Sequence, residues 1–213
     1  LPRGGDRVVA GALEYRGPIP LDGVDLATMG QLPTAEAQAT DTTLYGDQVS
    51  TLRRADAIWG ETLSPGYLTV WATIASRSLA ATLAKFCVYA VHTGLTGFDF
   101  GVYVGPNVSS LDRKATVTGL SWIAAAGMKV ANFGAVAVNR GDAVAFAGLT
   151  TGSGTAPRLA STTPATGAGA SALLNETPYS VYRSGQAAPL PLTLNLNDAV
   201  WLRANQKFWG SLR

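Results

Sequence analysis

Cysteine and histidine are almost absent from this sequence of 213 residues, which contains one of each. Cys87 therefore cannot form a disulfide within the chain, and its apolar neighbours in "KFCVYAV" favour a buried structural thiol over a nucleophile. His92 cannot build a two-histidine metal site within one chain, and its place before a turn indicates an exposed side chain rather than a general base. The motifs of zinc proteases, serine hydrolases and phosphate-binding loops are missing too. We expect no enzymatic activity, no metal and no other cofactor.

Charge is also scarce, because Asp, Glu, Lys and Arg make up 14% of the sequence against about 25% in ordinary soluble domains. The 16 basic and 14 acidic residues are interspersed and leave a net charge of +2. No run of Lys or Arg forms a basic stripe of the kind that binds phosphate backbones, so nucleic acid is not an expected partner. No apolar run approaches the ~18–20 residues that span a bilayer, so membrane insertion is not expected either. Such a neutral composition is typical of a chain that packs against other subunits.

The first 60 residues lack a sustained hydrophobic period. Prolines 18, 20 and 33 fix extended or turn geometry on both sides of short apolar groups. A short helix from about Asp47 to Ile58, with Asp47 as its N-cap, is one alternative for the end of this segment. We expect residues 1–60 to be an extended, mostly irregular arm that orders against a partner.

From Tyr67 onward the apolar residues recur with a period of two, which indicates half-buried β-strands. In "YLTVWATIA" this pattern places Leu68 and Val70 on the buried face and Trp71 on the opposite face. In "FDFGVYVG" it places Phe98, Phe100, Val102 and Val104 together, opposite Asp99, Gly101 and Tyr103. These strands could line an enzyme pocket or belong to an inert shell, and their alternation needs no catalytic explanation.

The remaining strands are separated by turn residues at intervals of ~8–12 residues, which predicts an antiparallel sandwich or barrel. Residues 139–142, "NRGD", separate two apolar runs and predict a hairpin. The leucines at 190, 192, 194 and 196 alternate with smaller or polar residues and predict a late strand. Residues 150–189 are rich in Gly, Ala and Pro, so we expect a surface excursion there. The fold class predicted for residues 61–213 is an all-β, jelly-roll-like antiparallel sandwich.

Aromatic side chains are the candidates for ligand contact, since the carboxylates are scattered and no spacing suggests a catalytic pair. Exposed aromatic rings on a sandwich stack against the apolar faces of sugar rings. Packing against the arm or against a neighbouring subunit is the alternative that we weight more heavily. The candidates are two tryptophans opposite the expected core face, one beside the "AAAG" turn, and two tyrosines in the late excursion: Trp71, Trp201, Trp122, Tyr179 and Tyr182.

Several stretches together resemble a known family. "PGYLTVWATIA", "FDFGVYVG", "VNRGDAVAFAGLTTGSGTAPRLA" and "PLPLTLNLNDAVWLRAN" look like the C-terminal jelly-roll domain of bacteriophage minor tail proteins, above all those of phages that infect actinobacteria. Residues 101–103, "GVY", stand where that family has a "GLY"-type strand, and residues 141–157 and 190–196 stand in place of its later motifs. The resemblance covers roughly residues 60–204.

The resemblance implies a structural protein on the exterior of the virion, a homo-oligomer, on family grounds a trimer, that contacts other virion proteins and takes part in host attachment. Gly-X-Y repeats are absent from the sequence, so a capsid decoration or head-fibre protein remains an alternative to a tail location. In the virion hypothesis the ligand is host cell-wall glycan. A freestanding carbohydrate-binding module, with a sugar as its ligand, is a second hypothesis. A hydrolase whose acidic pair is assembled only by folding is the third.

Overall fold

The structure is a computed structural model that describes residues 6–9, 12–15, 41–162, 180–204 and 206–213. The chain divides into two compact units, Leu1–Leu44 and Tyr45–Arg213. In the first unit β1 (Asp6–Val9) pairs antiparallel with β2 (Ala12–Tyr15). The rest of the predicted arm up to residue 40 lies outside the described residues. The boundary predicted near residue 60 falls instead after Leu44, because residues 45–60 belong to the second unit.

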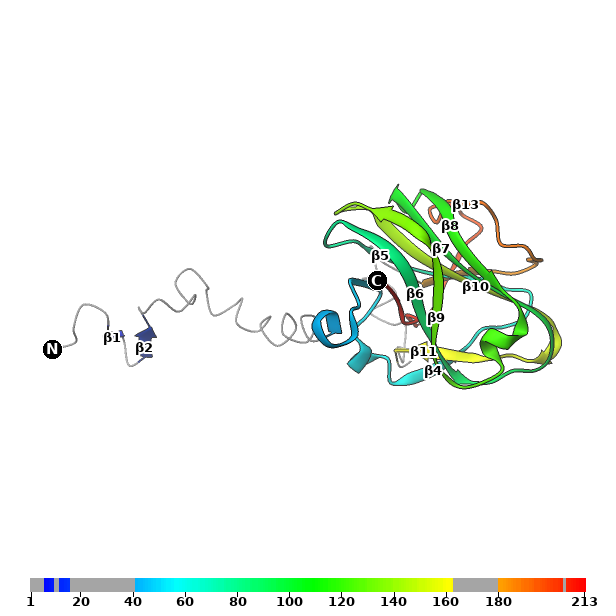
Figure 1. Ribbon diagram of the computed structural model, residues 1–213, viewed down its shortest axis with the longest axis horizontal. Coiled ribbons are helices and arrows are strands. Elements are labelled where there is room, and N and C mark those ends of the chain that lie inside the picture. The colour runs from blue at the N-terminus through cyan, green and yellow to red at the C-terminus, as the bar shows by residue number, and fades with distance from the viewer. Residues whose placement is uncertain (1–5, 10–11, 16–40, 163–179, 205) are drawn as a thin grey trace. The chain divides into compact units, whose positions relative to one another are not determined.

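The second unit is an all-β sandwich of two packed antiparallel sheets (Figure 1), which confirms the predicted fold class. One sheet has seven strands in the order β13-β8-β7-β10-β5-β12-β14. In this order their bounds are Thr193–Leu194, Ser110–Thr118, Thr93–Asn107, Ala143–Thr155, Leu68–Ile74, Ser180–Arg183 and Leu202–Arg203. Every pairing in the sheet is antiparallel, so each strand presents alternate residues to its two faces.

The other sheet has six strands, five of them in the order β3-β15-β6-β11-β4. The sixth strand, β9, pairs with the opposite side of β6, while β15 and β11 follow one another along its near side. The bounds of β3, β15, β6, β11, β4 and β9 are Val49–Ser50, Gly210–Leu212, Leu79–Ala90, Arg158–Ser161, Trp59–Thr62 and Gly127–Val138. Two 3₁₀ turns, η1 (Arg54–Asp56) and η2 (Leu120–Ile123), complete the unit.

The inner core, between the two sheets, is built around aromatic rings. Phe86 of β6 stacks on Phe100 of β7 with ring centroids 4.4 Å apart. Trp71 of β5 lies 5.0 Å from Phe208 and 6.4 Å from Phe146 of β10. These rings come from both sheets, so their contacts bury a large apolar area per residue and hold the layers together.

The seven-stranded sheet is buried on its outer face as well. Residues 190–201, which we call the cover segment, include the edge strand β13 and place Leu190, Leu194 and Leu196 in the outer core of this sheet (Figure 1, near the label β13). Leu68 and Val70 face this outer core, and Trp71 faces the inner core. The three residues therefore alternate between the two faces as predicted. Trp71 is therefore 1% exposed, and the prediction that it lies at the surface is wrong because the strand has no solvent face.

Three further predictions are corrected by the pairing. The turn at residues 139–142 forms, but β9 before it belongs to one sheet and β10 after it to the other, so it joins the sheets and closes no hairpin. The expected excursion at 150–189 contains the end of β10 together with β11 and β12, which pair within the sheets, while its residues 163–179 lie outside the described residues. The helix proposed for 47–58 is replaced by β3 and η1, and a helical turn occupies residues 41–45 instead.

The late strand predicted from the leucine alternation is mostly irregular. Only Thr193–Leu194 pairs, with β8, and Leu192 is 71% exposed. The cover segment is attached by hydrogen bonds of its backbone to the sheet. The Arg113 amide donates to the Leu192 carbonyl at 2.8 Å, and the Leu196 amide donates to the Val108 carbonyl at 2.8 Å.

Candidate functional site

The structure separates the five aromatic residues predicted as contact sites. Trp71 is in the inner core, and Trp122 is partly buried against the same core, with its ring 6.3 Å from that of Phe86. Trp201 packs on the outer core, and its indole nitrogen donates to the Asn195 carbonyl at 2.7 Å. These three tryptophans therefore pack within the sandwich itself, and packing against the arm or a neighbouring subunit stays a prediction.

The two tyrosines have different outcomes. Tyr179 lies outside the described residues. Tyr182, on β12, lines a cavity of about 400 Å³. The cavity lies where β4, an edge strand of the six-stranded sheet, meets β5, β12 and β14 of the other sheet. The sequence thus pointed to one residue of this cavity.

One wall of the cavity is aromatic. The rings of Tyr67 and Tyr182 lie 5.8 Å apart at an interplanar angle of 53°. Tyr182 is held beside Thr69 by the pairing of β12 with β5. Tyr67 follows Gly66, whose φ of 74° allows the tight turn into β5, and the Gly66 amide donates to the Thr150 carbonyl at 2.8 Å. Backbone hydrogen bonds at and beside β5 therefore fix the positions of both rings in this wall.

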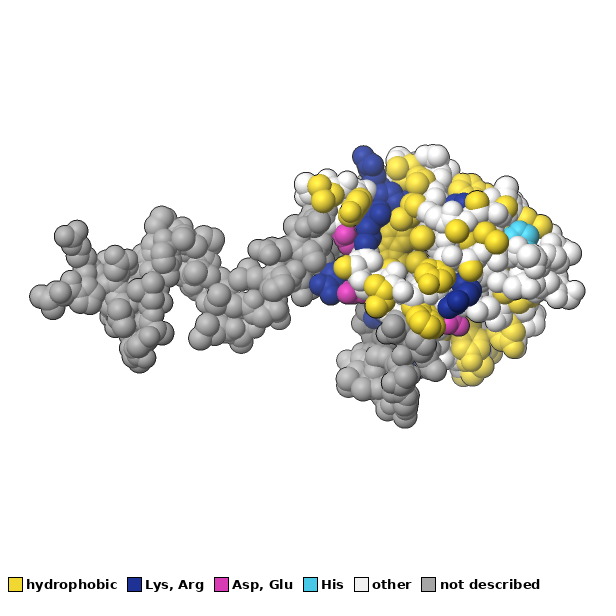
Figure 2. Space-filling model, turned by 90° about the horizontal axis from the view of Figure 1, so that it is seen from below, with side chains coloured by type: hydrophobic (Ala, Val, Ile, Leu, Met, Phe, Trp, Pro, Cys, Tyr) yellow, Lys and Arg dark blue, Asp and Glu magenta, His cyan; other side chains and the backbone are white. Residues whose placement is uncertain are grey.

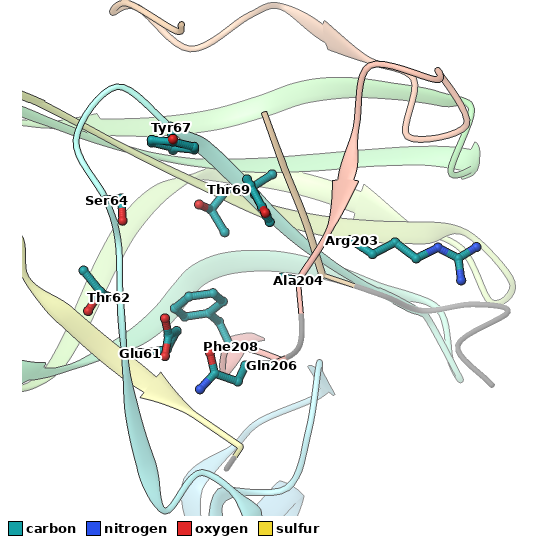
Figure 3. Close-up of a pocket in the computed structure, with 10 residues that line it drawn as sticks. Glu61, Thr62, Ser64, Tyr67, Thr69, Arg203, Ala204, Gln206 and Phe208 are labelled. Carbon is teal, nitrogen blue, oxygen red and sulfur yellow. The ribbon is translucent and has the colours of Figure 1, made fainter. Parts of the chain in front are cut away.

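The remaining wall is mostly polar. Glu61 is placed by the pairing of β4 with β11, where it lies opposite Leu159. In Figure 3 the Glu61 side chain lies beside Gln206 and Phe208, whereas the Arg203 side chain extends away from this group. The polar side chains that line the cavity are Glu61, Thr62, Ser64, Thr69, Arg203 and Gln206.

Several of these polar groups are available to a ligand. The side chains of Glu61, Ser64 and Gln206 form no hydrogen bond with another residue in the described part of the chain. Buried or half-buried polar groups are normally paired, so such a set inside a cavity is suited to bind water or a hydroxyl-bearing ligand. The cavity therefore combines aromatic faces with donors and acceptors, as small-molecule sites do.

The carboxylates limit the chemistry that the cavity can perform. Among the described residues that line it, Glu61 is the one carboxylate, and glycoside hydrolysis commonly uses two. The described residues also contain no group of three or more His, Cys, Asp or Glu side chains placed to hold a metal ion. Within the same residues, no helix has the length and apolar character needed to cross a membrane.

A second group of polar side chains is structural. Asp47, 1% exposed at its side chain, accepts from Arg54 Nε at 2.6 Å, Lys85 Nζ at 2.8 Å and Ser211 Oγ at 2.9 Å. Burial by itself would raise the pKa of Asp47, but these hydrogen bonds outweigh it and hold the pKa below its ordinary value. The residue predicted as a helix N-cap instead ties the segment before β3 to β6 and β15.

The lone cysteine and histidine are half-buried. Burial raises the pKa of the Cys87 thiol, which disfavours the nucleophilic thiolate. His92 is less exposed than predicted, and its Nδ1 is buried without a hydrogen-bond partner among the described residues. Neither residue lines the cavity.

The cavity residues that sequence reasoning missed carry little local signal. Glu61 and Gln206 lie far apart in the sequence and meet only because β4 and the segment before β15 border the same cavity. Tyr67 precedes a clear strand, so an aromatic residue next to the "SPG" turn was the one available hint.

Comparison of the chain with protein-family models and with curated proteins finds no match. Function is therefore inferred from the fold and from the cavity.

Proposed function

We propose that this chain is a non-enzymatic structural protein of a bacteriophage virion, of the minor-tail or tail-fibre type, displayed on the particle exterior. In this proposal the sandwich contributes to host attachment by holding a cell-wall glycan in the cavity beside Tyr67 and Tyr182. The resemblance of residues 60–204 to minor tail proteins supports the virion assignment. The low charge of the surface supports a chain that packs among other subunits; in Figure 2 charged side chains occur in small separate groups.

The observation that carries the glycan assignment is the composition of the cavity. Sugar rings present apolar C–H faces and a rim of hydroxyls, so they are bound by aromatic rings combined with neutral and charged hydrogen-bonding groups. Tyr67 and Tyr182 supply the rings, and Glu61, Ser64 and Gln206 supply groups that form no hydrogen bond with the rest of the described chain. A single carboxylate at this position fits binding better than cleavage.

The division of the chain into two units supports a role in assembly. Residues 45–213 form the sandwich, and the unit of residues 1–44 would dock on the particle or on sister chains. Closed homo-oligomers, with trimers implied by the family resemblance, would display several copies of the cavity and strengthen weak glycan binding through avidity. A capsid decoration protein would use the same arrangement at a different location.

The cavity also fits a freestanding carbohydrate-binding module, and the first unit distinguishes the two functions. A virion protein loses incorporation into particles when residues 1–44 are removed, whereas a freestanding module keeps its full function. Mass spectrometry of purified particles tests this directly. A few copies per particle would support a tail location, many copies would support the capsid, and none would contradict the virion assignment.

Glycan binding is tested by calorimetric titration of the full chain with a neutral N-acetylglucosamine tetrasaccharide. Tyr182→Ala and Tyr67→Ala should each weaken binding about fivefold, because stacking on one ring contributes roughly 1 kcal/mol. Tyr45→Ala, which removes an exposed ring outside the cavity, is the matched control and should leave the affinity unchanged. Unchanged affinity in both cavity variants would contradict the assignment, as would hydrolysis of the sugar that disappears in Glu61→Gln.

A further inference from the structure

An arginine lies between two exposed aromatic rings at the β4 edge of the six-stranded sheet. Val88 and Leu159 belong to the inner core, so their neighbours Tyr89 and Arg158 point to the opposite face of β6 and β11. Tyr89 is 53% exposed and Trp59, on the adjacent strand β4, is 41% exposed. None of Trp59, Tyr89 and Arg158 is among the residues that line the cavity.

The guanidinium group is fixed in place by its neighbours. Its central carbon lies 5.5 Å from the ring centroid of Trp59 and 5.2 Å from that of Tyr89. Its Nε donates to the Gly60 carbonyl at 2.8 Å. The two ring contacts and the hydrogen bond order the arginine before any ligand arrives, which reduces the conformational entropy lost on binding.

Gly60 is what allows this arrangement. A Cβ at residue 60 would lie 2.3 Å from Cδ1 of Tyr89, so the tyrosine ring rests directly on the glycine backbone. The ring thereby lies over β4, within reach of the same guanidinium that Trp59 contacts. The glycine, the two rings and the arginine form one preorganised group.

The terminal nitrogens of Arg158 have no partner in the described part of the chain. The described residues provide them with neither a hydrogen bond nor an ion pair. A guanidinium presents parallel N–H groups that match the two oxygens of a carboxylate, and this match gives short, charge-assisted hydrogen bonds. The exposed ring faces beside it match the apolar face of a sugar.

We propose that Trp59, Tyr89 and Arg158 form a second binding site, whose ligand is an acidic saccharide with a carboxylate on its sugar ring. The carboxylate pairs with the terminal nitrogens of Arg158, and the sugar ring stacks on Tyr89 or Trp59. This site is separate from the cavity, so it stands whether or not the cavity binds a neutral glycan. Acidic saccharides of a cell envelope are ligands of this chemistry.

Apolar side chains close to this group raise the alternative of a protein partner. Met128 and Val130, on β9, are exposed on the same sheet. An apolar protein surface seated over Arg158 would bury a charge whose terminal nitrogens have no partner in the described chain, which is costly. The arginine therefore favours an anionic ligand, and a protein partner becomes an outcome of the test.

The probe is a hyaluronan tetrasaccharide, in which glucuronate alternates with N-acetylglucosamine, titrated into the full chain by calorimetry and by NMR of the aromatic side chains. The neutral N-acetylglucosamine tetrasaccharide is the matched probe without carboxylates. We expect Arg158→Gln to weaken hyaluronan binding about thirtyfold and Tyr89→Ala about tenfold. Arg158→Lys keeps the charge but not the paired donors, so we expect it to restore only part of the affinity.

A control variant and the ring protons locate the effect. Arg140→Gln removes an exposed arginine at the turn before β10 and should leave hyaluronan binding unchanged. Trp59 and Tyr89 do not line the cavity, so their ring protons report this site separately, and failure of the cavity assignment can be told apart from failure of this one. Thermal unfolding of each variant excludes misfolding as the cause of a loss of binding. Ring-proton shifts of Trp59 and Tyr89 in the unmodified chain show whether the ligand binds beside these rings.

Three results would overturn the proposal. The first is hyaluronan affinity that Arg158→Gln does not change. The second is an equal effect of the neutral tetrasaccharide on the Trp59 and Tyr89 ring protons. The third is self-association in light scattering that Tyr89→Ala abolishes, which would make this face a contact between copies of the chain.

Discussion

The same strands contribute residues to the inner core and the outer core of the sandwich, but the two cores differ in composition. The inner core is a stack of large aromatic rings from both sheets, whereas the outer core is formed mainly by leucine, valine and alanine, with Tyr103 as its one fully buried ring among the described residues. Strand β10 shows the contrast within five residues, because Val144 and Phe146 face inward and Ala143, Ala145 and Ala147 face outward.

Small residues in the sheet are what let an irregular segment lie so close to it. A Cβ at Gly101 would approach Cδ1 of Leu190 to 2.8 Å, so the glycine makes room for the cover. The cover segment has one regular pairing, at Thr193–Leu194, and is otherwise attached by single hydrogen bonds from the backbone and from the side chains of Tyr103 and Arg113. We infer that the inner core sets global stability, while the outer core can open locally.

The largest expected effect comes from removing an inner ring. Phe100→Ala deletes a side chain that is 1% exposed and that stacks on Phe86. We expect a loss of about 4 kcal/mol in the free energy of unfolding, from lost burial and the cavity left behind. Denaturant unfolding monitored by tryptophan fluorescence measures this loss. A cost below about 1 kcal/mol would show that the rings do not dominate stability.

A buried polar group tests whether apolar packing is the whole account. Asp47→Asn leaves Lys85 buried without its carboxylate partner, and breaking such a pair costs about 3 kcal/mol. The pKa of Asp47 is lower in the folded chain than its ordinary value of 3.8. Its contribution is therefore fully present above pH 3.8 and is lost as the pH falls through the lower, folded value.

Stability measured as a function of pH checks this contribution. The unmodified chain should lose stability in acid more steeply than Asp47→Asn, since the variant lacks the titrating group. Asp112→Asn is the matched control, because Asp112 forms an exposed pair with Lys114 at 3.1 Å and should contribute little. Parallel acid profiles for the unmodified chain and Asp47→Asn would contradict the assignment.

A smaller and local effect is expected in the outer core. Leu194→Ala removes a leucine that is 4% exposed, and we expect a cost of about 2 kcal/mol because the cover can partly collapse around the gap. Leu192→Ala, two residues earlier and 71% exposed, is the matched control and should cost almost nothing. Hydrogen exchange should accelerate at the amides of Arg113 and Leu196 before the inner strands respond. Uniform acceleration throughout the sandwich would show that the two cores unfold together.

The fold class could be predicted because the period of two is strong where strands are long. The alternation at residues 98–104 correctly separated the inner phenylalanines from Tyr103. It could not show that both faces of a strand are buried, so Trp71 was placed at the surface. The pairing of the strands could not be predicted from the sequence either. The turn at 139–142 has the residues of a hairpin, although its flanking strands belong to different sheets.

The candidate sites were harder to predict because their members come from distant segments. Of the cavity residues, Tyr182 alone was selected from the sequence, and Glu61 and Gln206 meet it only through the pairing of edge strands. Arg158 and Tyr89 are separated in the sequence and come together because β11 pairs with β6. Local patterns describe strands, whereas sites of this kind depend on sheet order.

The smallest expected effect isolates one attachment of the cover segment. The Tyr103 hydroxyl donates to the Pro191 carbonyl at 2.7 Å, and burial raises the pKa of Tyr103, so the hydroxyl keeps its proton. Tyr103→Phe removes this hydrogen bond while preserving the ring, at a cost of about 1 kcal/mol. Tyr89→Phe, at an exposed ring, is the control and should be neutral. Because the bond joins the cover to β7, faster exchange should be confined to the cover segment and its partners on β8. Equal stability of Tyr103→Phe and the unmodified chain would show that this hydrogen bond contributes nothing to holding the cover in place.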